Sequence, residues 1–259
     1  MNIIVCIKQV PSTNEVRLDP VTGTIVRDGR QSVINPFDTY AIEEAVCLKE
    51  QLGGKVTALS MGIPATERLL RDAMARGVDE AVLLTDRAFA GADTLANSYA
   101  LSLGARHIGS FDLIICGRMA VDGDTAQIGP ELSRQLNVGF ASDVCHIEKA
   151  SENELICDKL MDGGVARVRV QLPAVITVTK DINMPRMASI AGVRYSLQAP
   201  FESLTAEQLK ADLDRCGLKG SPTRVLRSFA PDRSHQAQVL NGTAQELAAQ
   251  VLQIGKEVL

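Results

Sequence analysis

The residues best suited to chemistry lie in one turn, residues 117–130, which reads GRMAVDGDTAQIGP. The turn follows an apolar strand and precedes a predicted helix, and the unpaired N–H groups at the start of a helix attract anions. Gly123 would let the backbone approach a phosphate closely, and Thr125 could cap the helix and donate its hydroxyl group. The turn predicts contact with a phosphorylated nucleotide; an ordinary strand–helix turn with an Asp/Thr cap is the alternative interpretation.

The charged side chains of this turn suit different parts of a nucleotide. Arg118 could neutralise a pyrophosphate, and Gln127 offers a neutral donor and acceptor. Asp122 and Asp124 would repel a phosphate, so they are better suited to accept hydrogen bonds from ribose hydroxyls or to cap N–H groups. No GxGxxG follows a strand and no GxxxxGK(S/T) occurs in the sequence. Both a standard dinucleotide-fold dehydrogenase and a P-loop NTPase are therefore disfavoured.

Alternating strands and helices must position this turn. Apolar runs predict strands, and stretches with helical spacing of apolar residues follow each of them. This order predicts an α/β fold, a parallel sheet with helices on both faces, of the Rossmann-like, adenine nucleotide-binding type. Ligands of such sheets bind beyond the carboxyl ends of the strands. The predicted strands are 2–10, 55–60, 80–85 and 112–116, and the predicted helices are 40–52, 64–76, 94–108 and 125–136.

The pattern changes after residue 140. Segments 142–148, 154–161 and 165–172 alternate in period two, with a hairpin turn at 162–164, and 173–179 reads as one more buried strand. Prolines then interrupt the chain, and only short helices are predicted, at 207–214 and 243–258. We expect a nucleotide- or flavin-binding α/β domain at 1–200 and, at 201–259, a C-terminal arm that wraps a partner subunit.

Composition excludes several classes of protein. The 259 residues are 46% hydrophobic and 22% charged, which is typical of a packed globular protein. A net charge of −4 with no Trp, three Tyr and six Phe argues against nucleic-acid binding. No apolar run approaches the ~20 residues of a membrane span, and the apolar start is too short for a secretory leader. We therefore expect a cytoplasmic protein that does not bind membranes.

Six cysteines and three histidines are scattered along the chain, and no CxxC pair occurs. Metal and iron–sulfur sites need clustered ligands, so we expect none here. In a reducing compartment such cysteines are usually small buried apolar residues.

Several motifs together resemble the beta subunit of the electron transfer flavoproteins over nearly the whole chain. One position departs from the family's hairpin signature, because Ala166 stands where Glu or Gln is usual. The motifs are residues 5–11 (VCIKQVP), 35–38 (NPFD), 60–62 (SMG), 117–127, 172–175 (LPAV) and 182–186 (INMPR).

The resemblance implies a heterodimer with an alpha subunit that carries one FAD, while a pocket of the beta subunit holds a structural AMP or the adenosine half of a second FAD. Cys6 and Met61 could equally be core residues that contact the ligand only through their backbone. Carried over by position, the nucleotide contacts would be Cys6, Asn35, Pro36, Phe37, Asp38, Met61, Gly117, Arg118, Val121, Asp122, Gly123, Asp124, Thr125, Ala126, Gln127 and Ile128.

The resemblance favours FAD in this pocket. AMP-holding members tend to carry Asp-Asp-x-x-Asn-Gln in the turn, whereas residues 122–127 read DGDTAQ, which is similar to the electron-bifurcating branch. Gly123 and Ala126 also leave room for a pyrophosphate. The tail, residues 217–223 with Phe229 and Pro231 beyond, resembles the same branch.

In bifurcating members, NADH delivers a hydride to the beta-subunit flavin. One electron then passes to ferredoxin or flavodoxin, and the other passes through the alpha-subunit FAD to a partner dehydrogenase. The flavin carries the redox chemistry, so no catalytic side chain is expected, and oxidation of NADH would require the alpha partner. The alternative is a non-bifurcating carrier with a structural AMP that passes electrons from dehydrogenases to a quinone reductase.

The resemblance also implies a docking loop for an acyl-CoA, enoyl-CoA or hydroxy-acid dehydrogenase. Residues 186–193 match this loop, with Ile190 as the apolar anchor and with Arg186 and Ser189 beside it. Ile190 could instead fold into its own core. A nucleotide-hydrolysing or stress-type protein on the same sheet would need a glycine-rich loop after the first strand, but residues 8–13 (KQVPST) contain no glycine.

Overall fold

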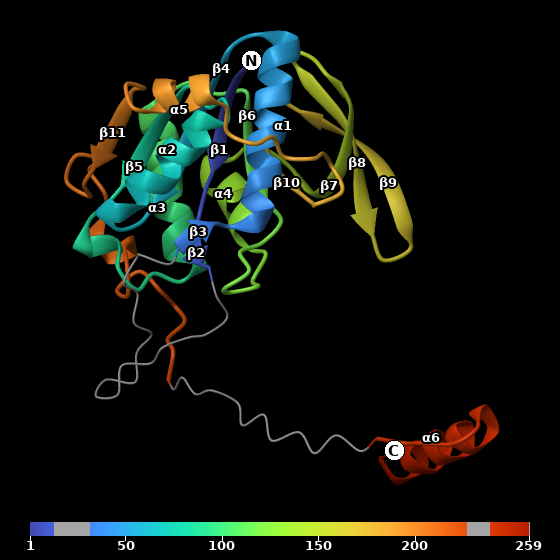
Figure 1. Cartoon of the computed structure of the whole chain (residues 1–259). Helices are drawn as coiled ribbons and strands as arrows, with labels where there is room; N and C mark the ends of the chain where they lie inside the picture. The colour runs from blue at the N-terminus through green and yellow to red at the C-terminus, as the bar shows by residue number, and fades with distance from the viewer. Residues whose placement is uncertain (13–31, 227–238, 259) are drawn as a thin grey trace. The chain divides into compact units, whose positions relative to one another are not determined.

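A nine-stranded sheet forms the frame of this protein (Figure 1), whose computed structural model describes residues 1–12, 32–226 and 239–258. The first seven strands in spatial order pair in parallel, and the last two add an antiparallel hairpin. The order is β11 (Phe201–Leu204), β5 (Glu80–Leu84), β4 (Lys55–Met61), β1 (Asn2–Cys6), β6 (Leu113–Gly117), β10 (Ala174–Val178), β7 (Gly139–Ala150), β8 (Glu154–Met161) and β9 (Gly164–Gln171).

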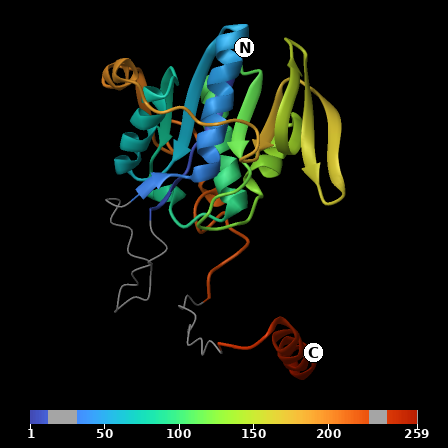
Figure 2. The ribbon, with the colours of Figure 1, turned by 45° about the vertical axis from the view of Figure 1, so that its right-hand side comes forward.

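Helices cover both faces of the sheet, because successive residues of each buried strand point to opposite sides. Ile3 and Val5 of β1 join the core formed with α1 (Pro36–Leu52) and α2 (Glu67–Ala75). Ile4 and Cys6 join the core formed with α3 (Thr94–Ile108) and α4 (Ile128–Leu136). Figure 2 shows α1 lying across one face. The predicted α/β fold is confirmed.

The first predicted strand is divided in two. β1 ends at Cys6, and residues Gln9–Pro11 form β2, which pairs antiparallel with β3 (Ser32–Ile34) in a small separate sheet. α1 begins at Pro36, four residues earlier than predicted, because proline suits the first turn of a helix, where its missing N–H costs nothing. The short 3₁₀ turns η1 (Pro64–Thr66) and η2 (Arg87–Phe89) precede α2 and α3.

The chain forms two units, Met1–Val225 and Leu226–Leu259, so the division falls at residue 225 rather than at 200. Residues 201–225 pack with the first unit because β11 extends the sheet beside β5. The helix predicted at 207–214 was wrong: Lys210 has a left-handed φ of 51°, and only the 3₁₀ turn η3 (Leu213–Arg215) forms there. The second unit contains α6 (Ala244–Val258), which agrees with the prediction.

One short helix was not predicted. α5 (Ile190–Ser196) has seven residues, fewer than a periodic pattern needs for detection, and it contains Gly192. Among the described residues, no helix combines the length and apolar character needed to cross a bilayer. The cytoplasmic location stays a prediction.

We expect Gly54→Ala to lower the free energy of unfolding by about 3–4 kcal/mol, because it combines a left-handed φ with a backbone clash. Gly54 has φ 109°, and a Cβ there would lie 2.1 Å from the Met1 carbonyl oxygen, which accepts from Lys55 N. Gly53→Ala is the matched control: its φ is also positive, at 72°, but a Cβ would meet nothing within 4 Å. It should lose only about 1 kcal/mol. Equal losses in urea unfolding would contradict this account.

Candidate functional site

Two buried polar side chains organise the carboxyl edge of β1 and β6. Asn35 Nδ2 donates to Asp38 Oδ1 and to the Met119 carbonyl oxygen, both at 2.9 Å, and Asn35 Oδ1 accepts from Val121 N at 3.1 Å. The other Asp38 carboxylate oxygen accepts from Lys8 N at 2.7 Å. The residues after β1, the start of α1 and the turn after β6 are thereby joined, and we call Asn35 and Asp38 the polar hub.

Burial dominates the chemistry of the hub. It raises the pKa of Asp38 from its ordinary 3.8 to about 7, although hydrogen bonds from Asn35 and Lys8 act in the opposite direction. Gly117, at the end of β6, permits this close packing, because a Cβ there would lie 2.4 Å from Asp38 Oδ1 and 2.7 Å from Phe37. Pro36 is exposed and Phe37 is half-buried at the start of α1. The structure therefore brings residues 35–38 and the turn together.

Two of the three charged side chains of the turn, Arg118 and Asp122, have partners within the chain, whereas Asp124 has none among the described residues. Lys8 Nζ lies 2.6 Å from Asp122 Oδ1, and Arg118 Nε lies 2.8 Å from Asp143 Oδ1. The Gln127 amide oxygen accepts from Thr94 Oγ1 at 3.1 Å. These contacts engage one carboxylate oxygen of Asp122 and the Nε of Arg118.

The backbone of the turn is better placed than its side chains to bind an anion. Residues 121–127 are all exposed, and the N–H groups of Thr125, Ala126 and Gln127 have no acceptor within the described part of the chain. Asp124 and Ala126 have left-handed φ values of 51° and 54°, a strained conformation for residues other than glycine. A Cβ on Gly123 would meet nothing within 4 Å, so the space above it is open. Successive N–H groups in such a turn can bind a phosphate.

The predicted cap by Thr125 was wrong. α4 begins at Ile128, and Gln127 occupies the N-cap position without a side-chain capping bond. The strained residues 124 and 126 delay the start of the helix, and this cannot be read from composition.

Glu131 in the first turn of α4 was not predicted to belong to the site. One of its carboxylate oxygens accepts from Thr94, whereas the other is buried with no partner among the described residues.

Two predicted contacts lie mainly in the core. Cys6 at the end of β1 is buried, and the half-buried Met61 packs on the core of α3 and α4. Cys116, opposite Cys6 on β6, is buried as well. Cys6 and Met61 can meet a ligand chiefly through their backbone, which agrees with the alternative interpretation of these two residues.

The tail that follows η3 is held by hydrogen bonds near the start of α3. Thr223 donates from its N–H and its hydroxyl group to Asp93, which also caps α3. A cavity of about 310 Å³ lies here, away from the turn. The basic side chains that line this cavity already have partners. Arg215 lies 3.9 Å from the centre of the Tyr99 ring, and Lys219 is paired with Asp214. Phe229 and Pro231 lie outside the described residues.

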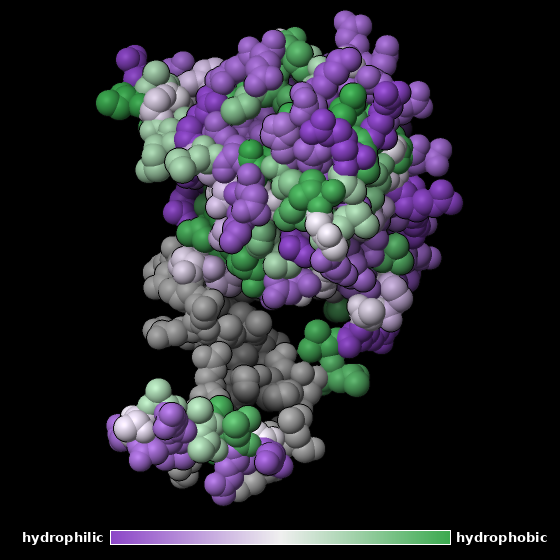
Figure 3. Space-filling model, turned by 90° about the vertical axis from the view of Figure 1, so that its right-hand side faces the viewer, coloured by the Kyte–Doolittle hydropathy of each residue, from purple (hydrophilic) through white to green (hydrophobic). Residues whose placement is uncertain are grey.

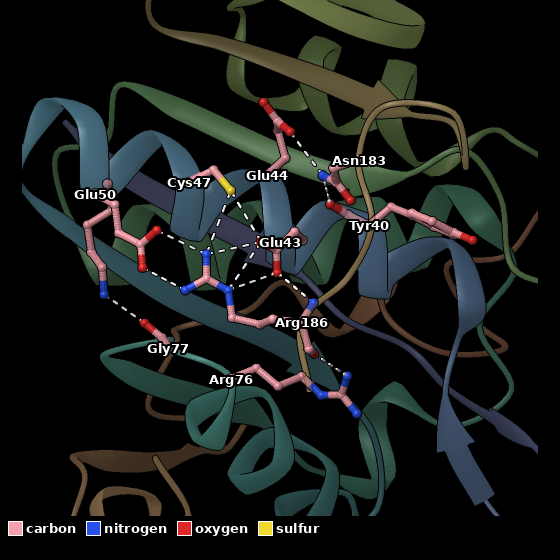
Figure 4. Close-up of polar contacts among 10 residues, drawn as sticks. Tyr40, Glu43, Glu44, Cys47, Glu50, Arg76, Gly77, Asn183 and Arg186 are labelled. Atoms are coloured by element: carbon pink, nitrogen blue, oxygen red, sulfur yellow. Dashed lines mark hydrogen bonds and ion pairs between the residues drawn. The ribbon is translucent and has the colours of Figure 1, made fainter. Parts of the chain in front are cut away.

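A second feature is an exposed apolar segment, residues 183–190, between β10 and α5. Met184, Met187 and Ile190 are 89%, 84% and 86% exposed, so Ile190 does not fold into its own core. Ser189 caps α5 by accepting from Gly192 N at 2.9 Å. Arg186 differs from these residues, because its guanidinium lies against Glu43 and Glu50 of α1 (Figure 4).

The hairpin strands bring together one acidic cluster. His146, Glu148 and Asp158 place ligand atoms within 4.8 Å of one another, a proximity that the hairpin register creates and the sequence alone did not reveal. Arg167 donates to both Glu148 and Asp158, so one positive charge already offsets part of their negative charge. The face that carries β8 and β9 is largely hydrophilic (Figure 3).

Comparisons with known proteins agree on one family. The electron transfer flavoprotein domain matches residues 22–209. The chain is 44% identical to the electron transfer flavoprotein subunit beta of Thermoanaerobacterium thermosaccharolyticum, over 95% of this chain and 94% of that protein. It is 42% identical to the subunit beta of Clostridium acetobutylicum, over 99% and 98%. It is 41% identical to the caffeyl-CoA reductase-Etf complex subunit CarD of Acetobacterium woodii, over 94% and 93%.

We expect Asp38→Asn to change how stability depends on pH. The folded-state pKa of Asp38, about 7, lies above its ordinary 3.8, so the folded chain holds this proton more tightly. The stabilisation of the folded state by this proton is fully present below pH 3.8 and is lost as the pH rises to 7. An amide does not titrate, so the free energy of unfolding of the variant relative to wild type should rise on the order of 3 kcal/mol between pH 4 and 7.5. If the free energy of unfolding, measured in urea, changes with pH in the same way for Asp38→Asn and for wild type, this account is contradicted.

Proposed function

Because this chain belongs to the electron transfer flavoprotein family and aligns with its beta subunits over almost its full length, we propose that it binds FAD and takes electrons from NADH. In this proposal, it is one half of a heterodimer with an alpha subunit. One electron passes to ferredoxin or flavodoxin, and the other passes through the alpha-subunit FAD to a partner dehydrogenase. Electron transfer itself is the activity of the family.

The observation that carries the proposal is the backbone of the turn. Three consecutive N–H groups, those of Thr125, Ala126 and Gln127, lack an acceptor within the described residues, and the space above Gly123 is open. Backbone donors can bind the oxygens of a diphosphate without a cationic side chain. Backbone donors of this kind would also bind an AMP. The numbers of FAD and AMP molecules bound per heterodimer therefore decide between FAD and AMP in this pocket.

FAD would supply the one- and two-electron chemistry when bound. The chain's own residues would bind and orient it. The N–H groups of residues 125–127 donate to the diphosphate, and the polar hub fixes the turn against β1. The second carboxylate oxygen of Glu131 is buried without a partner among the described residues, and burial raises the pKa of this carboxyl group.

The exposed segment 183–190 supports the second part of the proposal, docking to a dehydrogenase. Apolar side chains that are more than four-fifths exposed contribute nothing to the chain's own core, but they suit the apolar centre of an interface. We propose an acyl-CoA, enoyl-CoA or hydroxy-acid dehydrogenase as the occupant, with Ile190 as anchor. The name of the relative from Acetobacterium woodii places that protein in a caffeyl-CoA reductase complex.

We expect two FAD molecules per heterodimer when the complex with the alpha subunit is denatured and its nucleotides are quantified. NADH should reduce the flavin of the intact complex. One FAD with one AMP, and no reduction by NADH, would instead support a non-bifurcating carrier that delivers electrons to a quinone reductase.

Gly123→Val should release the nucleotide of the beta subunit without destabilising the chain, because a side chain at this position meets only the space proposed for the diphosphate. We expect bound nucleotide to fall by half or more. Gly163→Val is the matched control, since a Cβ in this hairpin turn also meets nothing within 4 Å. Retention of nucleotide by Gly123→Val would place the binding site elsewhere.

Ile190→Asp should weaken docking by about tenfold, measured as KM for a dehydrogenase that shows saturable electron transfer with the wild-type heterodimer. A charge in the centre of an apolar interface must be desolvated without a partner. Met161→Asp, at a residue that is 59% exposed on the hairpin, should leave KM unchanged. An unchanged KM for Ile190→Asp would remove this segment from the interface.

A further inference from the structure

One side of α1 carries a row of polar contacts to the exposed segment. Tyr40, Glu43, Glu44, Cys47 and Glu50 follow one another at intervals that place them along one stripe of a helix. Figure 4 shows Asn183 and Arg186 lying along this stripe. Asn183 Nδ2 donates to the Tyr40 carbonyl oxygen at 3.0 Å and to Glu44 at 2.9 Å.

Arg186 makes the densest contacts of this row. Its Nε donates to both Glu43 carboxylate oxygens, at 3.1 and 3.0 Å, and its Nη1 donates to Glu50 at 2.6 Å. Its Nη2 donates to Glu43 and to Glu50, each at 3.0 Å, and its backbone N–H donates to Glu43 at 2.9 Å. We call Glu43, Glu50 and Arg186 the latch. The planar guanidinium has several N–H donors in a fixed fork, so it can donate to two carboxylates at once. A lysine ammonium lacks this geometry.

The latch is partly desolvated, so its members depend on one another. Glu43 is only 7% exposed, and a buried carboxylate without a partner is costly. Burial tends to raise the pKa of Glu43, but the hydrogen bonds from Arg186 outweigh it and hold that pKa below its ordinary value. Burial and the neighbouring Glu43 raise the pKa of the Cys47 thiol to about 11, so the thiol stays protonated and donates to Glu43.

Little else attaches the exposed segment. Within the described part of the chain, Met184, Pro185, Met187 and Ala188 make no hydrogen bond, and residues 183–189 form no helix or strand. Apart from the bonds of Asn183 and the cap of α5 by Ser189, only Arg76 adds a hydrogen bond among the described residues, by donating to the Arg186 carbonyl oxygen at 3.2 Å.

α5 is held separately. A Cβ on Gly192 would lie 2.1 Å from the Ala75 carbonyl oxygen, and Arg71 donates to the Ser196 and Ala199 carbonyl oxygens. Loss of the latch would therefore free residues 184–188, whereas Asn183 would keep its bonds to α1, and α5 and the sheet would stay in place.

We propose that Glu43 and Glu50, acting through Arg186, are positioning residues for partner docking: the latch holds Met184 and Met187 beside Ile190 in one fixed arrangement before a dehydrogenase binds. This inference rests on the docking role proposed for the exposed segment. Arg186 then acts from inside the chain rather than as a contact to the partner. A segment ordered in advance loses less conformational entropy on binding, so the benefit is in affinity for the partner.

The test uses the natural heterodimer with Arg186→Gln and Glu43→Gln. Amide hydrogen exchange at residue 186, whose N–H donates to Glu43, should become about tenfold faster in both variants, because the charged contacts that hold this bond in place are lost. Exchange in α5 and β1 should not change. KM for the dehydrogenase should rise about tenfold, while kcat and bound nucleotide stay at wild-type values. Glu50→Gln should have a smaller effect, about threefold, because the Glu50 side chain is 53% exposed.

Two further variants separate positioning from loss of charge. Arg186→Lys keeps the charge but loses the planar fork, so it should recover KM only partly. Arg134→Gln removes one exposed positive charge from α4, on the opposite face of the sheet, and should behave as wild type.

The outcomes distinguish this inference from the proposed function. Unchanged exchange at the residue 186 amide in Arg186→Gln, or faster exchange there with an unchanged KM, overturns the latch. If Ile190→Asp raises KM while Arg186→Gln does not, docking stands and the positioning role fails. If neither variant raises KM, the docking assignment fails and the inference fails with it.

Discussion

The carboxyl edge of the sheet depends on the burial of Asn35 and Asp38 with partners for their polar atoms. A buried amide or carboxylate that lacks hydrogen bonds raises the free energy of the folded state. This cost is larger than the stabilisation that one formed hydrogen bond provides. The hub meets this requirement only when the residues after β1, the first turn of α1 and residues 119–121 lie together. The backbone of the turn after β6 is therefore placed by the core.

α1 supports both functional regions of the molecule. Its inner face supplies Ala41, Ile42 and Ala45 to the core, its first turn carries the hub, and its polar stripe carries the latch. The two regions can thus keep a fixed geometry without touching each other, because one 17-residue helix packed on the sheet holds both. This arrangement suits a protein that must hold a redox group in one place while it meets a separate partner.

The sheet was readable from the sequence because buried parallel strands are apolar runs, as in NIIVC of β1 and LIICG of β6. The exposed Ile190 was also recognised, through motifs rather than through patterning. The hub bonds were not, since Asn35 and Met119 are 84 residues apart in the sequence. Glu43 and Glu50 look like ordinary solvated residues of a helix, and only the fold reveals that Arg186, 143 residues beyond Glu43, lies against them.

The same limit applies to the side chains of the turn, because their partners within the chain come from distant parts of the sequence. Arg118, Asp122 and Gln127 suggest a binding site made of side chains, but Asp143, Lys8 and Thr94 already occupy them. With Arg118 and Asp122 paired in this way, the turn offers exposed backbone N–H groups beside Asp124, a carboxylate that has no partner among the described residues. Recognition by such groups depends on the direction and number of donors rather than on attraction at a distance. Asp124 and Ala126 have left-handed φ values, a conformation that lowers local stability for residues other than glycine.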